Sequence, residues 1–246
     1  MRYKSFIIFL SFVSFFYLNS IQLESLQMEA STDSETPSIS SEQIISLDLT
    51  YVHGGDFILG KPFDEEELTE KILSSPNLEE LNLSGQSISS ALMSIIRENS
   101  PKLKKLKIKG SVRFNNGDGS YYSEESINQQ VVSAEMLQDL FSNESPIEVL
   151  DFSLSTIDDS GLEKISHGAY NLRELYLQGV SGVTGDGIIA LFDKLPNIKL
   201  IDLSSYTLRQ PMAHKKTIAP KVSKELIEAL SGQGVIIIQN DRTPWF

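Results

Sequence analysis

The sequence contains no cysteine. Disulfide bonds, thiolate nucleophiles and cysteine-ligated metal sites are therefore excluded, although a secreted protein can do without disulfides. Histidine is also scarce, because the 246 residues include only 3, which lie far apart at His53, His167 and His214. None of them has a neighbour at the spacing of a metal site or a catalytic triad. We therefore expect a protein that is not an enzyme and that needs no cofactor and no metal.

Basic residues are too few to balance the acidic ones. The chain has 21 Lys and Arg against 33 Asp and Glu, which gives a formal net charge of −12. Nucleic acids and anionic membranes are also negatively charged, so they repel such a chain. We therefore expect no nucleic-acid partner, and membrane contact only through the N-terminal segment if that segment stays uncleaved.

The start of the chain has the pattern of an export signal. Arg2 and Lys4 precede a mostly apolar run, residues 6–18. A basic start followed by such a run is typical of a secretory signal peptide, and the run is shorter than the about 20 residues of an ordinary membrane-spanning helix. We predict a signal peptide over residues 1–20 and a secreted or cell-surface protein, membrane-anchored if the segment is not cleaved. A buried helix is the remaining interpretation. Residues 21–43 are small, polar and acidic, which predicts a flexible linker.

Six short segments share the pattern L-x-x-L-x-L, with Ile or Phe at some Leu positions. A period of about 20 to 29 residues with this pattern indicates a leucine-rich repeat, in which each unit forms one short strand and one return helix. Neither element can bury its apolar side alone, so the units must stack. We predict an α/β leucine-rich-repeat solenoid over residues 44–246, a right-handed superhelix with a curved parallel sheet on the concave face and helices on the convex face. The segments begin at Ile44, Leu78, Leu103, Ile147, Leu172 and Ile198.

The segments between the strands predict where helices begin and end. Asp64 is a candidate N-cap for a helix that Pro76 would end. Residues 235–238 form a continuous apolar run, which predicts a last, buried parallel strand. Residues 244–246, Pro-Trp-Phe, are expected to cover the open end of the core. The other helices are predicted over residues 90–98, 134–141 and 223–230.

Two insertions interrupt the period, near residues 110–132 and 206–221. Both follow a strand and precede a helix, so we expect them on one rim of the solenoid, and such insertions often gather on the binding face. Phe114, Tyr121 and Tyr122 in the first insertion are therefore candidate partner contacts. The alternative is a surface loop without function, because long surface insertions cost little free energy.

Two stretches between strand and helix carry a further pattern. Residues 157–162 read Ile-Asp-Asp-Ser-Gly-Leu, and residues 183–188 read Val-Thr-Gly-Asp-Gly-Ile. They resemble the I-T-D-x-G-L segment of the cysteine-containing, ribonuclease-inhibitor-like class of leucine-rich repeats, found in the repeat domain of F-box leucine-rich proteins. Here other residues replace the cysteine of that class, and the linker leaves no room for an F-box. The resemblance implies a protein-binding module.

The sheet itself offers candidate contacts, because side chains alternate along a strand and those between the core leucines point away from the core. We predict a mixed-charge recognition strip with a tyrosine anchor, since aromatic residues are enriched at interface hot spots. The alternative for the lysines is that neighbouring strands neutralise each other, as Lys107 and Asp151 would. The candidate partner-binding residues of the sheet are Lys105, Lys107, Lys109, Asp151, Tyr176 and Asp202.

Two patterns that resemble catalytic or cofactor sites have simpler explanations. Residues 185–190 match G-x-G-x-x-A, part of a dinucleotide-binding fingerprint, but Asp186 would place a negative charge near the pyrophosphate. Asp158 and Asp159 stand at a helix start, where capping explains them. We therefore predict an exported module that binds a partner protein, as an effector or surface protein. One alternative is an intracellular ubiquitin-ligase-type substrate receptor without its adaptor domain, and another is an enzyme with a site in the inserted loops.

Overall fold

A computed structural model describes residues 44–54, 57–112, 127–208 and 216–242. All of them belong to the larger of two compact units, Ile39–Phe246. The predicted signal peptide and linker, Phe114, Tyr121, Tyr122 and residues 244–246 lie outside the described residues. No helix among the described residues has the length and apolar character that crossing a membrane requires.

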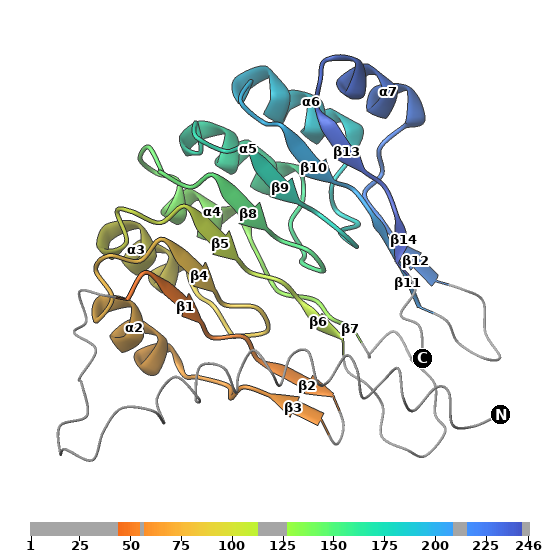
Figure 1. Cartoon of the computed structure of the whole chain (residues 1–246). Helices are drawn as coiled ribbons and strands as arrows, with labels where there is room; N and C mark the ends of the chain where they lie inside the picture. Colours follow the sequence, from red (N-terminus) through yellow and green to blue (C-terminus); the bar gives the residue numbers. More distant parts are fainter. Residues whose placement is uncertain (1–43, 55–56, 113–126, 209–215, 243–246) are drawn as a thin grey trace, which may run out of the picture. The chain divides into compact units, whose positions relative to one another are not determined.

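A seven-stranded parallel sheet organises the described unit (Figure 1). Each strand pairs with the next one along the sheet in the same direction, so that the middle residues of neighbouring strands, such as Leu81 and Leu106, lie side by side. The strands follow the predicted segments, which confirms an α/β fold built on a parallel sheet. In sheet order they are β1 (Ser46–Asp48), β4 (Glu80–Asn82), β5 (Lys105–Lys107), β8 (Val149–Asp151), β9 (Glu174–Tyr176), β10 (Leu200–Asp202) and β13 (Ile236–Ile238).

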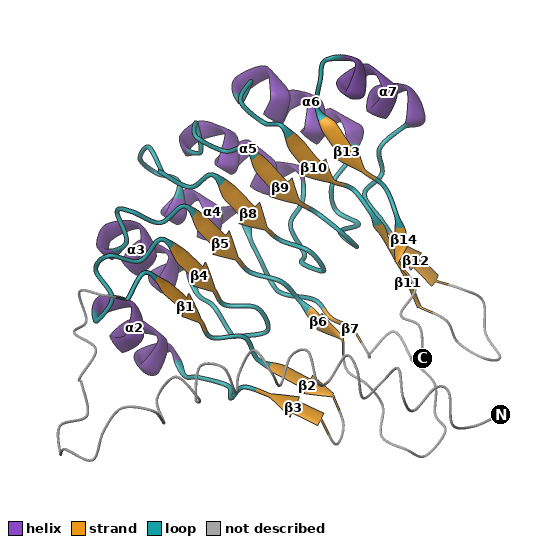
Figure 2. Cartoon of the chain, viewed as in Figure 1, coloured by secondary structure: helices purple, strands orange, loops and turns teal. Residues whose placement is uncertain are grey.

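The helices of the described residues lie on one side of this sheet (Figure 2). Each begins after a Ser, Thr or Asp residue, the side chains that best accept hydrogen bonds from the free N–H groups of a first helical turn. Asp64 caps the first of them and also receives the reciprocal bond from Glu67, as the sequence predicts. The helices are α2 (Glu65–Leu73), α3 (Ser90–Asn99), α4 (Ala134–Leu140), α5 (Asp159–Gly168), α6 (Gly185–Lys194) and α7 (Lys224–Gly232).

Helices and sheet enclose one apolar core. The three leucines of the second segment, Leu78, Leu81 and Leu83, are each at most 1% exposed. The segments from Leu103 to Leu203 bury the same positions, whereas in the first segment only Leu49 is buried and Ile44 and Leu47 are partly buried. The helices contribute residues such as Leu162 and Ile188 to the same cluster. Burying one such side chain stabilises the fold by about 1.5–3 kcal/mol, so the inward positions of the repeated pattern hold the units together.

Short hairpins follow three of the sheet strands. The described parts of both predicted insertions form strand pairs, and a further pair follows β1, where the sequence indicates a loop. All three lie beyond the carboxyl ends of the sheet strands (Figure 1), as expected for segments inserted between a strand and its helix. The hairpin strands are β2 (Val52–Gly54) with β3 (Phe57–Leu59), β6 (Ser111–Val112) with β7 (Ile127–Asn128), and β11 (Ser205–Leu208) with β12 (Lys216–Ile218) and β14 (Asp241–Arg242).

The prediction that the last strand is fully buried is wrong. β13 is parallel to β10, as predicted, but among the described residues it is the last strand of the sheet and has β10 as its one neighbour. Val235 is buried, whereas Ile236 is 60% exposed. Ile237 packs toward the core, and its two neighbours, Ile236 and Ile238, point to the opposite face of the sheet. The strand thus carries apolar side chains on both faces, which gives a continuous apolar run in the sequence.

Candidate functional site: the open face of the sheet

The face of the sheet opposite the helices, called the open face below, carries two rows of side chains. Each strand contributes its first and third residues, because side chains alternate along a strand. The parallel register aligns these residues into rows that cross all seven strands. The first row is Ser46, Glu80, Lys105, Val149, Glu174, Leu200 and Ile236. The second row is Asp48, Asn82, Lys107, Asp151, Tyr176, Asp202 and Ile238.

The three candidate lysines of the open face have different surroundings. Lys105 donates a hydrogen bond of 2.6 Å to Glu80 on the neighbouring strand, and this contact raises the pKa of the Lys105 ammonium. The Nζ atom of Lys109 lies 3.6 Å from the Oδ2 atom of Asp151 on the neighbouring strand, which makes an ion pair. Lys107 is beside Asp151 in the register, but it makes no ion pair within the described residues. Neutralisation by neighbouring strands therefore applies to two of the lysines, and the expected pair of Lys107 with Asp151 does not form.

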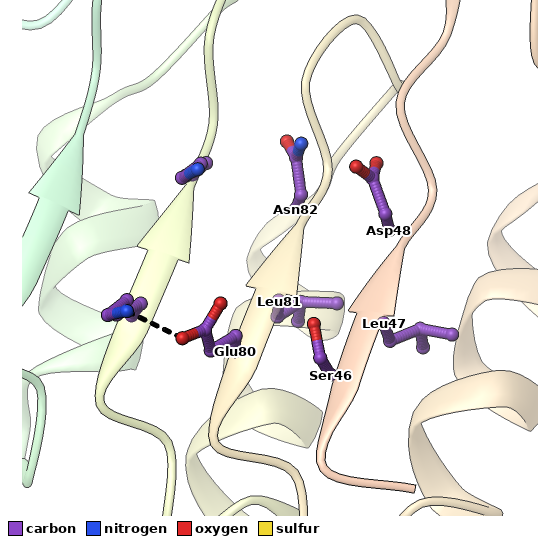
Figure 3. A pocket seen from close by; sticks show the side chains of 8 residues that line it. Ser46, Leu47, Asp48, Glu80, Leu81 and Asn82 are labelled. Carbon is purple, nitrogen blue, oxygen red and sulfur yellow. Dashed lines mark hydrogen bonds and ion pairs between the residues drawn. The ribbon is translucent and has the colours of Figure 1, made fainter. Parts of the chain in front are cut away.

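The outward residues of β1, β4 and β5 form the charged half of the open face, and they surround a shallow hollow (Figure 3). The hollow encloses about 60 Å³, far less than the roughly 300–1,000 Å³ of a typical small-molecule pocket. A metabolite would find little enclosure there. The residues that line it are Ser46, Leu47, Asp48, Glu80, Leu81, Asn82, Lys105 and Lys107.

The two candidate aspartates have a structural task. Asp151 is 9% exposed and Asp202 only 3%. Their carboxylates accept hydrogen bonds from the backbone N–H of Ser153, at 3.0 Å, and Ser204, at 2.9 Å. An Asp or Asn side chain that accepts from the residue two positions later closes a local turn. Both carboxylates thus hold the chain where it leaves a strand.

The same turn follows two other strands. Asp48 accepts from the backbone N–H of Thr50, and Asn82 accepts from that of Ser84. The sequence signal was present, since an acidic or amide residue, an apolar residue and a Ser or Thr follow one another in four repeats. The strand pattern alone does not reveal the turn, because the turn residue also occupies an outward position of the strand.

Tyr176 lies near the middle of the second row, between Asp151 and Asp202. Its ring is half-buried, and its hydroxyl donates a hydrogen bond of 2.8 Å to Glu174 on the same strand. Burial, followed by this hydrogen bond and the negative charge of Glu174, raises the pKa of Tyr176 to about 12. The phenol therefore stays neutral at physiological pH and presents its ring as an apolar surface.

The apolar half of the open face comprises Val149, Tyr176, Leu200, Ile236 and Ile238. Ile236 is exposed, and the other four are half-buried. The carboxylates among them are engaged within the protein, because Glu174 accepts from Tyr176 and Asp202 closes its turn. On this side of the predicted mixed-charge strip the charged groups are carboxylates with partners inside the protein. The apolar surface beside them was not predicted from the sequence.

The residues considered for catalysis or cofactor binding are explained by packing and caps. Asp158 caps α5 by accepting from the N–H of Gly161, as predicted. The Asp159 carboxylate instead accepts from the N–H and hydroxyl of Thr184 in the next unit. Gly187 packs so closely against Asp159 that a Cβ would not fit, which accounts for one glycine of the apparent dinucleotide fingerprint. No group of three His, Asp or Glu side chains in the described residues could hold a metal ion.

Comparison with known proteins adds no relative. No protein-family model matches the chain, and comparison with curated proteins finds no match either.

Proposed function

We propose that this chain is a leucine-rich-repeat solenoid of the ribonuclease-inhibitor-like class, and that it binds another protein through the open face. The repeated L-x-x-L-x-L segments and the alternation of strands with helices support the assignment. Repeat folds of this kind present an extended surface on one side, and insertions gather on the binding side. The hairpins after β1, β5 and β10 fit that arrangement.

The observation that carries the proposal is the apolar half of the open face. Ile236 is 60% exposed, and Leu200 beside it is half-buried on a face that the helices do not cover. Large contiguous apolar patches are uncommon on monomeric soluble proteins and often mark interaction sites. The hollow of the charged half is small, which favours a protein as the partner over a metabolite.

The proposal includes export, since the basic start and the apolar run of residues 6–18 favour a secretory signal. The partner would then be an extracellular protein or a protein of another cell. Intact mass of the protein recovered from a native-like host tests this part. Loss of about twenty residues and recovery outside the cytosol are expected. A full-length protein in the cytosol would overturn the export and direct the search to intracellular partners.

Site-specific photo-crosslinking tests the use of the open face. A photoreactive amino acid replaces Leu200 in the full chain, and a matched control carries it at Ile189 on α6, an apolar residue that is 45% exposed away from the sheet. After irradiation in the native-like host, a discrete crosslinked protein is expected from the Leu200 position only. Crosslinking from Ile189 without crosslinking from Leu200 would place the partner on the helices and refute the proposal.

A further inference from the structure

We infer that the open face takes a partner segment with apolar side chains at one end and a carboxylate at the other. The carboxylate pairs with Lys107, and the apolar side chains cover Leu200, Ile236 and Ile238. This inference rests on the proposed function and specifies the chemistry of the partner. Its basis is the contrast between the two halves of the open face, together with the way each charged group there is already used.

Lys107 forms the polar end of the proposed binding surface. Lys105 and Lys109 have carboxylate partners on neighbouring strands, whereas Lys107 has none within the described residues. Its side chain is exposed on the open face, beside the hollow of the charged half. An unpaired cation on this surface repels a basic group and attracts an acidic one. A carboxylate of the partner would supply the missing counter-charge.

The apolar end contains two carboxylates, and both already have partners within the protein. Glu174 already accepts a hydrogen bond from Tyr176, and Asp202 is buried and accepts from Ser204. These contacts hold both carboxylates against the protein. What remains for a partner is the apolar surface of Leu200, Ile236 and Ile238, with the ring of Tyr176 beside it. Large aliphatic or aromatic side chains on the partner match this surface.

The sheet fixes the spacing of the two ends. Lys107 is on β5 and Ile236 is on β13, four strand positions away, which is about 19 Å at the usual strand separation of ~4.8 Å. An extended segment spans that distance with about six residues, and a helix with roughly 13. The partner segment is therefore short enough to be selected from a peptide library.

A second copy of this chain is a less suitable occupant. Each copy carries a formal charge of −12, so association is opposed by repulsion. An outside partner whose acidic group is confined to the Lys107 end avoids most of that repulsion. Native mass spectrometry or light scattering separates the two cases, and a dimer that the substitution Ile236→Lys dissolves would overturn the inference.

The test uses a displayed library of random peptides of about 16 residues, long enough to span the distance as a helix, selected against the full chain. Enriched peptides are expected to combine large apolar residues with an acidic residue, and to lose at least tenfold in affinity against Lys107→Glu and against Ile236→Lys. Lys224→Glu on α7 and Ile189→Lys on α6 make the same chemical changes on the helix side and should leave affinity within about twofold. Among the described residues, the ion pair of Lys224 is with Glu228 of the same helix.

The variants separate failure of the inference from failure of the proposed function. Peptides that Leu200→Ser weakens but Lys107→Glu does not would retain the open face as the binding site and overturn the acidic end. Peptides that no open-face variant affects would overturn both, and so would enrichment of no peptide. Circular dichroism checks that each variant folds, and Lys107→Met and Ile236→Ser replace any variant that does not.

Discussion

The charged half and the apolar half of the open face share one strand pattern but use their outward side chains differently. In the charged half, polar groups satisfy one another, as Lys105 and Glu80 do. In the apolar half, the carboxylates have partners on their own chain segment, and Leu200 and Ile236 face outward on the side that the helices do not cover. The inward residues define the repeat, so the outward residues of the first row are free to differ from one strand to the next.

The turns that end the strands do not distinguish the two halves, because the same turn occurs in both. Asp48 in the charged half and Asp202 near the apolar half each accept from the backbone N–H two residues later. The surroundings differ, since Asp48 is exposed and Asp202 is buried. The same hydrogen bond should therefore contribute differently to stability on the two sides.

The largest effect is expected for Gly85→Ala, in the turn after β4. Gly85 has φ +77°, a conformation that costs an alanine about 1–2 kcal/mol. A Cβ there would also collide with the backbone oxygen of Tyr51 in the preceding unit, and such overpacking typically costs about 1–3 kcal/mol more. We expect a loss of about 3 kcal/mol in the free energy of unfolding, measured by urea denaturation.

Gly234→Ala is the matched control, between α7 and β13. Gly234 has a similar φ of +87°, but a Cβ there would meet open space. Only the cost of the left-handed backbone applies, so a loss of about 1–2 kcal/mol in the free energy of unfolding is expected. Equal losses of unfolding free energy for the two variants would show that the close approach between the first two repeats adds no cost to Gly85→Ala.

The next effect compares Asp202→Ala with Asp48→Ala. Removal of the Asp202 carboxylate leaves the Ser204 N–H buried without its acceptor, which costs about 1–3 kcal/mol. Water can replace the exposed Asp48 carboxylate, so the second variant should change stability by about 0.5 kcal/mol or less. Asp202→Asn retains an acceptor and should lie between them. Denaturation midpoints measure all three, and a larger loss for Asp48→Ala would contradict the assignment.

The sequence predicts the scaffold well, because the inward positions repeat with a regular period. The predicted start of α2 after Asp64 and the strand centres at Leu81 and Leu175 are confirmed. These features depend on local chemistry, namely a capping side chain and an apolar residue at a fixed position. The hairpin after β1 was not predicted, since its short strands lack an apolar alternation that would distinguish them from a loop.

The open face was harder to predict, because its properties depend on which neighbours each side chain meets. Asp151 and Asp202 were identified as outward-facing, but periodicity alone does not reveal that their carboxylates close turns. The exposure of Ile236 follows from the position of β13 at the end of the sheet, a fact of topology. Whether these residues bind a partner stays a prediction.

Tyr176 offers a test by pH. Burial and the Glu174 contact raise its pKa to about 12 from 10.0. The unfolded tyrosine ionises near pH 10 while the folded one keeps its proton, so the stabilising contribution is present below pH 10 and is lost as the pH rises to about 12. The ultraviolet difference titration between wild type and Tyr176→Phe measures this pKa. Glu174→Gln should lower it toward 10.0, and an unshifted value in wild type would contradict the geometry.

The smallest effect is expected for Lys105→Met, which removes the cation from the exposed pair with Glu80. Both side chains are 46% exposed, and pairs of this kind contribute little to stability, because water and salt screen them. The unfolding midpoint should not change measurably. Binding sharpens the comparison, since Lys105 is already neutralised and Lys107 is not. Lys105→Met should therefore reduce the affinity for the selected peptides less than Lys107→Met does. The reverse order would mean that the ion pair with Glu80 does not decide which lysine a partner uses.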